Sequence, residues 1–449
     1  MTEKDRAPFF FNPLRSRILL VFVLAHLGFA LVLGEIYAFA PDEGGYLGIF
    51  NELYSRHFSL AGHLGWVGTT PIWYLQIIYM PAKLLTYLGI PSYFALRLLA
   101  ITLSGISVYL ILCIAKHQAS REKFFWKALI AVLFIPTAFF WMTLSLREEF
   151  LFLGLSSFCA GLYLLNRERQ RLALFLLALG AFSVCNTKGY LFVLMVFAVV
   201  ALILIRTILR RHFVGAHSVL ILAIVLPLFF SPATAKSLAT AVAGQFTTKH
   251  GTLITAFDGA GTSEQISSTS GSTTTQALAA EVNAHPDNIF SKLALKAKLV
   301  EKAKPSSTTT STVTQDPKRV ARLSLQPGHL HEPLTLFAPS ARFLILPSPF
   351  IDNGSKFQNL GSLEEVIWWG LYLLLAFMIY RLIRSHRKID DLFIWAGAYS
   401  VFFIIISAVT EINVGTALRH RSILLIPMLA MILMCQEPAK VVSVKSVSA

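Results

Sequence analysis

Two adjacent carboxylates, Asp42 and Glu43, follow the first apolar helix of the chain, which is predicted over residues 17–40. Carboxylates at the edge of a bilayer are costly unless water or a function keeps them there. A carboxylate at this level can act as a general base on a substrate carried by a membrane lipid. Neighbouring side chains of an extended segment point in opposite directions, so only one of the two is expected to reach a reacting centre. The pair predicts a catalytic site at the membrane surface.

Further charged residues are predicted at the same membrane level, in the turns and helix ends of later apolar segments. They are Arg97, Arg147, Glu148, Glu149, Lys188, Arg342, Arg419 and Arg421. Acidic and basic groups that converge from separate loops can bind an anionic lipid headgroup and place a general base beside it. We therefore expect these residues to line one substrate-binding site.

Each of these groups also has a plain structural interpretation. Arg419 and Arg421 would then reach outward to lipid phosphates, and Lys188 would be an interface anchor. Arg147 would form a structural ion pair with a neighbouring glutamate. Asp42 and Glu43 would lie in a solvated turn. The sequence alone leaves both interpretations open.

The composition identifies the class of protein that holds these residues. Of the 449 residues, 55% are apolar and only 14% are charged, which indicates an all-α polytopic membrane protein. The formal net charge is +15, but many basic residues fall in short clusters between apolar segments, which argues against nucleic acid as a partner. The four cysteines are isolated within apolar stretches and show no metal-ligand spacing.

About ten transmembrane helices are predicted from runs of apolar residues. They are 18–40, 92–115, 128–146, 149–165, 172–187, 189–206, 217–232, 363–382, 391–410 and 422–436. Basic clusters fall on one side throughout, which predicts cytoplasmic termini and an external Asp42. The first apolar run is longer than a signal-peptide core, so we expect it to be retained as an anchor. A bacterial inner (cytoplasmic) membrane is the expected location.

Three regions are predicted along the chain. Residues 1–232 form a membrane core whose first external loop, 41–91, carries juxtamembrane helices over 46–58 and 71–90. Residues 233–362 form an external Ser/Thr-rich loop, and its prolines after Leu334 predict a partly re-entrant end. Residues 363–449 supply the last transmembrane helices and a short cytoplasmic tail.

Four short motifs, in the same order along the chain, resemble those of the GT-C superfamily of membrane glycosyltransferases. They are Asp42-Glu43-Gly44-Gly45-Tyr46, Ala95-Leu96-Arg97, Arg147-Glu148-Glu149 and Thr187-Lys188-Gly189. The pattern is that of the family 39 type, which includes protein O-mannosyltransferases and the bacterial lipid A aminoarabinose transferase. It covers roughly residues 15–215. The chain departs from it at Thr70-Pro71-Ile72, where the family has Pro-Pro-Leu, and at the two glutamates of the second acidic motif.

The resemblance implies a GT-C-like fold and transfer of a sugar from a polyprenyl-phosphate carrier to an extracytoplasmic glycan, lipid or protein, with inversion. Asp42 would deprotonate the acceptor hydroxyl, with Glu43 beside it, and Tyr46 would contact substrate. Lys188, Arg342 and Arg419 would hold the phosphate. Because a phosphate leaves as a stable anion, a divalent metal ion is optional, and no other cofactor is implied.

Two other functions remain open at this stage. A polysaccharide polymerase or ligase also acts on lipid-linked sugars outside the cytoplasm and needs external cations. The position of Asp42-Glu43 directly after the first helix favours the single-sugar transferase. A non-enzymatic export or transport protein would place charges deep within its spans, whereas the charges of this chain are predicted at helix ends.

Overall fold

The computed structural model of the chain describes most of the predicted membrane core. The described residues are 13–34, 41–55, 73–118, 134–165, 167, 170–208, 218–225, 337–347, 349–350, 356–385, 389–410 and 414–435. Their regular structure is helical, with no strand among them, which confirms the predicted all-α class. Most of the predicted external loop 233–362 lies outside these residues.

Seven helical segments of the described residues are long and apolar enough to cross a membrane, which indicates a multi-pass membrane protein. The helices concerned are α5 (Ser92–Gln118), α8 (Glu148–Leu165), α9 (Gln170–Thr187), α10 (Gly189–Ile208), α18 (Lys356–Arg384), α19 (Asp391–Thr410) and the continuous run of α20 (Val414–Arg421), η3 (Ser422–Leu424) and α21 (Leu425–Met434). These segments coincide with seven of the ten predicted spans.

The other predicted spans are described in part. Helix α1 (Pro13–Leu33) contains a shorter apolar stretch, Arg17–Leu33. Within the predicted span 128–146 the structure has α7 (Pro136–Thr143), and within 217–232 it describes helical residues 218–225. The remainder of both segments lies outside the described residues, so ten spans stay a prediction.

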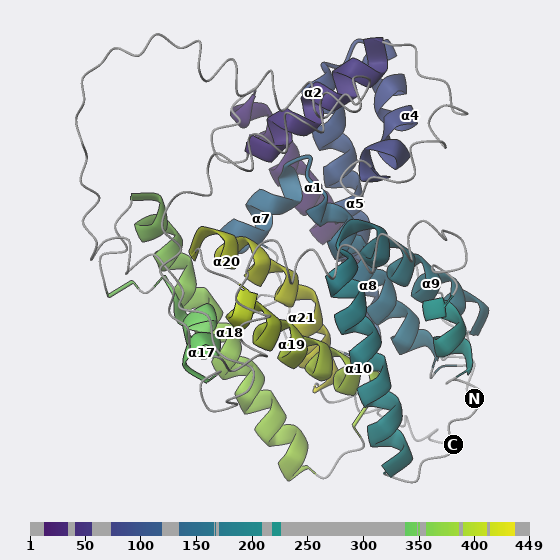
Figure 1. The fold of residues 1–449 in the computed structure, drawn as a ribbon, viewed down its shortest axis with the longest axis vertical. Helices are drawn as coiled ribbons and strands as arrows, with labels where there is room; N and C mark the ends of the chain where they lie inside the picture. The colour runs from purple at the N-terminus through teal and green to yellow at the C-terminus, as the bar shows by residue number, and fades with distance from the viewer. Residues whose placement is uncertain are drawn as a thin grey trace, which may run out of the picture. The chain divides into compact units, whose positions relative to one another are not determined.

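Helix α8 lies at the centre of the packing. All of its residues are buried, and it packs against α5 and α9 (Figure 1). Helix α10 packs against α19, which in turn packs against α21. By contrast, α18 is mostly exposed, since only 22% of its membrane-spanning window is buried. Burial therefore distinguishes α8, which is covered by protein, from α18, whose apolar side chains are largely exposed.

Glycines allow the close approach of α8 and α9. A Cβ added to Gly180 would lie 2.6 Å from the carbonyl oxygen of Gly154 and 2.8 Å from the amide of Phe158. A Cβ added to Gly161 would lie 2.7 Å from Leu177 Cγ. Small residues let helix backbones come together in a membrane, where packing contributes much of the helix association. These glycines hold the helix that begins with Glu148 against the helix that ends just before Lys188.

Replacing Gly180 by alanine is expected to destabilise the protein by about 1–3 kcal/mol, because the added methyl group would overlap backbone atoms that cannot rotate away. Gly370 provides a matched control in another spanning helix, since a Cβ there would meet nothing within 4 Å. Thermal unfolding in the same detergent would compare the two variants. Equal stability of Gly180→Ala and Gly370→Ala would contradict this account of the α8–α9 contact.

Two further helices lie between α1 and α5, where juxtamembrane helices are predicted: α2 (Pro41–Ser55) and α4 (Trp73–Tyr87). Phe50 of α2 packs with Ile78, Tyr79 and Ala82 of α4 and with Leu96 of α5. Both helices form near the predicted positions. However, α2 begins at residue 41, so the acidic pair lies in a first helical turn and not in an extended segment.

The helical start of α2 has local causes in the sequence. Pro41 occupies the first helical position, where its missing N–H costs nothing and its fixed φ suits a helix. Asp42 and Glu43 follow in the first turn, where acidic groups interact favourably with the helix dipole. Successive helical positions point about 100° apart, so the two side chains diverge without pointing in opposite directions.

Candidate functional site

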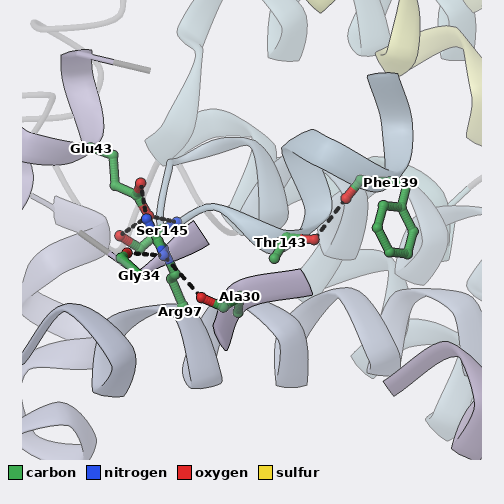
Figure 2. A network of polar contacts seen from close by, with 7 residues as sticks. All are labelled: Ala30, Gly34, Glu43, Arg97, Phe139, Thr143 and Ser145. Carbon is green, nitrogen blue, oxygen red and sulfur yellow. Dashed lines mark hydrogen bonds and ion pairs between the residues drawn. The ribbon is translucent and has the colours of Figure 1, made fainter. Parts of the chain in front are cut away.

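Glu43 and Arg97 form a buried ion pair. Arg97 Nε lies 2.8 Å from Glu43 Oε1, and Arg97 Nη2 lies 2.9 Å from Oε2. Arg97 Nη1 also donates to the carbonyl oxygens of Ala30, at 3.2 Å, and Gly34, at 2.5 Å. Glu43 Oε1 in turn accepts from the amide of Ser145 at 3.0 Å (Figure 2). The exposed fractions are 0% for Arg97 and 2% for Glu43.

This pair changes the interpretation of Glu43. Two parallel bonds to a guanidinium are among the strongest and most directional side-chain contacts. These bonds hold the start of α2 against α5. The further contacts with Ala30, Gly34 and Ser145 connect the pair to the end of α1 and to the turn before α8. A carboxylate held in this way is a positioning group, and we no longer assign it a catalytic role. Asp42 directly precedes it on α2, with a side chain outside the described part of the structure.

Glu148 is the centre of a second cluster, formed with two cations. Its Oε1 lies 3.3 Å from Lys188 Nζ and 2.9 Å from Arg419 Nη2, and Arg419 Nε donates to the same oxygen at 3.1 Å. Lys188 Nζ also lies 3.1 Å from His420 Nε2. The Arg419 guanidinium lies 5.0 Å from the centre of the Trp141 ring. Two cations from distant parts of the sequence therefore share one carboxylate oxygen, and each cation has a further side-chain neighbour.

The residues of the Glu148 cluster come from several helix ends that meet at one end of the bundle. Glu148 begins α8, Lys188 separates α9 from α10, and Arg419 belongs to α20. The predicted convergence of Glu148, Lys188 and Arg419 is thus present in the structure. One detail differs, because Arg419 and Arg421 lie within a helix and not in an open turn.

Glu149 lies beside this cluster and is fully buried. Its side chain is 0% exposed, and among the described residues neither carboxylate oxygen is hydrogen-bonded. In the same part of the structure, Arg147 Nε and Glu148 Oε2 are also buried without a hydrogen bond. Glu149 is also within electrostatic range of Glu43 and Glu148. Buried polar atoms are nearly always satisfied in folded proteins, so this group is a candidate for contact with a bound substrate.

Burial sets the protonation behaviour of Lys188. Removal from water lowers the pKa of Lys188 to about 8, and the charges of Arg147 and Arg419 act in the same direction. Glu148 opposes this shift, because its negative charge stabilises the ammonium group. Lys188 is therefore charged at neutral pH and loses its charge as the pH rises through about 8.

Arg421 has a structural role that the sequence did not reveal. Its side chain is fully buried and forms an ion pair with Glu365 of α18. It also donates to the carbonyl oxygens of Phe343 and Leu346, which flank the end of α17 (Phe337–Ile345), at 2.5 Å in the case of Leu346. Both interpretations of Arg421 made from the sequence, substrate binding and contact with lipid phosphates, are therefore replaced by a buried junction of three helices.

The remaining predicted residues lie outside the Glu148 cluster. Tyr46 is partly buried on α2 and packs against the apolar cluster around Phe50. Arg342 is exposed on α17, one position before Phe343. The structure has the short helix α17 within the segment after residue 334, and its predicted re-entrant character stays a prediction. Neither Tyr46 nor Arg342 is part of the ion pairs around Glu148 and Glu43.

Several buried polar groups were missed in the sequence. His26 of α1 lies 2.7 Å from Thr143 Oγ1, between the rings of Phe22 and Phe139. Glu364 of α18 accepts from the amide of Thr137 at 2.8 Å and from Trp368 Nε1 at 2.8 Å. Charged residues at the start of a long apolar helix are costly without partners, a signal that would have identified Glu364 and Glu365.

Within the described ranges, no group of three or more His, Cys, Asp or Glu side chains is placed to hold a metal ion. The four cysteines are all buried. In comparisons with known proteins, no family model, curated protein or solved structure matches the chain.

Proposed function

We propose that this protein is a membrane glycosyltransferase that moves a sugar from a polyprenyl-phosphate carrier to an acceptor at the membrane surface. In this proposal the carrier phosphate binds Lys188 and Arg419, and Asp42 removes the proton from the acceptor hydroxyl. The acceptor oxygen then attacks the anomeric carbon and the carrier phosphate leaves. The motifs shared with the GT-C superfamily support the reaction type.

The observation that carries the proposal is the sharing of one buried carboxylate oxygen by two cations. Lys188 and Arg419 approach Glu148 Oε1 to 3.3 and 2.9 Å, and Lys188 is almost completely buried. Glu148 keeps both cations in fixed positions beside Glu149, whose carboxylate has no hydrogen-bond partner among the described residues. Fixed cations in a water-poor site stabilise the negative charge that develops on a leaving phosphate. In addition, Glu148 and Arg419 belong to candidate membrane-spanning helices and Lys188 lies between two of them, which suits a lipid-carried substrate.

The test measures the affinity for single-sugar polyprenyl phosphates and the rate of sugar transfer from them, with the purified full-length protein in lipid nanodiscs. Lys188→Met should weaken carrier binding about 10- to 100-fold, since a hydrogen bond to a charged group is worth about 1.5–3 kcal/mol. Arg171→Met is the matched control, because Arg171 is an exposed arginine at the opposite end of α9. Unchanged carrier affinity in Lys188→Met would contradict the assignment. Turnover of lipid-linked oligosaccharides alone would favour a polymerase or ligase.

The pH dependence of carrier binding should follow the charge of Lys188. Because the pKa of Lys188 is lowered to about 8, the ammonium is present below this pH and is lost above it. Affinity for the carrier should therefore decrease between about pH 7 and about pH 9. Lys188→Arg keeps a permanent charge and should flatten this profile over the same range. An identical decrease in both proteins would assign the titration to another group.

A further inference from the structure

A second polar site lies at the opposite end of the bundle from Glu148. Helix α18 places Glu365 beside Arg421, two positions from Arg419, and ends at Arg384. The intervening residues span about 29 Å at 1.5 Å per residue, close to the thickness of a bilayer core. The end of α18 is therefore expected at the headgroup level of the other membrane face.

A cavity of about 430 Å³ opens at this end, between α18 and the end of α21. Its described lining consists of Phe377, Tyr380, Arg381, Leu382, Arg384, Ser385 and Cys435. The volume falls within the range typical of small-molecule sites. Leu382 and Cys435 are 6% and 5% exposed and belong to an apolar cluster with Met378, so the cavity has an apolar floor. Guanidinium and hydroxyl groups form its polar part.

The charge of the cavity suits an anion. The described lining residues bring two positive charges, from Arg381 and Arg384, and no negative one. Arg384 Nη1 donates to the phenolic oxygen of Tyr380 at 3.3 Å, which restrains one guanidinium beside the opening. Arginine presents several N–H donors in a planar arrangement that matches phosphate oxygens. The polar part of the cavity is therefore suited to a phosphate group.

The surface beside the cavity suits an acyl chain. Leu373, Phe377, Tyr380 and Ile383 lie on α18 at spacings of four, three and three residues, which places them on one face. Their exposed fractions are 73, 56, 56 and 67%. This apolar face leads along the helix to the two arginines. A ligand that used both features would carry a negatively charged head and a hydrocarbon tail.

We propose that this cavity binds the phosphate headgroup of an anionic membrane lipid, with the lipid chain along the exposed face of α18. The site is separate from the Glu148 cluster and does not depend on the proposed transferase activity. Arg381 and Arg384 bind the phosphate, and the apolar floor and helix face bind the glycerol and acyl parts. The site differs from a general basic surface because it requires both the cavity and the two charges.

Native mass spectrometry of the full-length protein in detergent, with phosphatidylglycerol and phosphatidylcholine as probes, tests the site. The wild-type protein should retain phosphatidylglycerol preferentially. The double variant Arg381→Gln/Arg384→Gln should lose about 10-fold or more of this affinity, since a basic residue near a lipid surface contributes about 1 kcal/mol. Arg171→Gln removes an exposed arginine from another helix at the same face and should bind phosphatidylglycerol like the wild type. Equal losses in the double variant and Arg171→Gln would overturn the proposal.

Two further experiments test whether binding requires the cavity as well as the two charges, and whether the ligand is a lipid or a free phosphate ion. Ser385→Trp fills the cavity while both arginines remain, and it should also reduce phosphatidylglycerol binding about 10-fold. Unchanged binding in Ser385→Trp, with a wild-type elution profile in size-exclusion chromatography, would overturn the assignment to the cavity. Inorganic phosphate at about 10 mM should leave phosphatidylglycerol bound because it lacks the chain contacts with α18. Its displacement of the lipid would instead identify a site for the free anion.

Discussion

Arg97→Met should lower the free energy of unfolding by about 3–5 kcal/mol, the usual cost of removing one partner of a buried ion pair. The substitution would leave Glu43 buried without its guanidinium, and the carbonyl oxygens of Ala30 and Gly34 would lose their donor. Since this cluster joins α1, α2 and α5, all three should loosen together. Thermal unfolding of the purified protein, followed by loss of the monodisperse peak in size-exclusion chromatography, would measure the effect.

Two comparisons identify the ion pair as the cause. Arg171→Met removes an exposed arginine and should change stability by less than about 0.5 kcal/mol. The double variant Glu43→Gln/Arg97→Met removes the uncompensated charge and should be more stable than Arg97→Met alone. Wild-type stability in Arg97→Met would show that the Glu43 pair is not what holds α2 in place.

Asp42→Asn should reduce sugar transfer about 100-fold or more while carrier binding and stability remain near those of the wild type. Asparagine keeps the size of aspartate and suits the start of a helix, but it cannot accept the proton of an attacking hydroxyl. Glu43 cannot replace Asp42 in this role, because both of its oxygens are bound to Arg97. Initial rates of transfer from a radiolabelled polyprenyl-phosphate sugar would measure the loss.

Glu149 provides the direct comparison for Asp42. It is a buried carboxylate with no hydrogen-bond partner in the described residues, so it is the alternative proton acceptor at this face. Glu149→Gln should retain much of the transfer rate if Asp42 is the base. A large loss in Glu149→Gln together with normal transfer in Asp42→Asn would move the base to Glu149. The two variants thus distinguish the two carboxylates within one assay.

The spanning helices were predictable from the sequence because hydropathy over about 20 residues is a strong signal. Seven predicted segments reappear within a few residues of their expected ends. The last one begins earlier than expected, at Ala417, because Arg419 and Arg421 obtain buried partners and no longer interrupt the helix. A charged residue that marks the end of a span in a hydropathy profile can therefore lie inside the helix when a side chain of another helix neutralises its charge.

The polar groups that meet at one face were also predictable, but their individual roles were not. Topology alone places Glu148, Lys188 and Arg419 at the same level. The choice of partners depends on side-chain geometry across distant helices, which a single sequence does not contain. Arg421 therefore looked like Arg419 in the sequence, although one is paired with Glu365 and the other with Glu148. Likewise, Glu43 looked like Asp42 until its contact with Arg97 was known.

The complete burial of α8 has a consequence for biogenesis. Together with α9 it has the lowest mean hydropathy of the seven spanning segments, and it begins with two carboxylates. Such a segment partitions poorly into lipid as an isolated helix. If both helices left the translocon as one hairpin, the close glycine contacts between α8 and α9 would shield part of the less apolar surface of each helix from lipid. Cotranslational insertion of the two as a unit would therefore bring Glu148 and Lys188 together before the C-terminal half of the chain is synthesised.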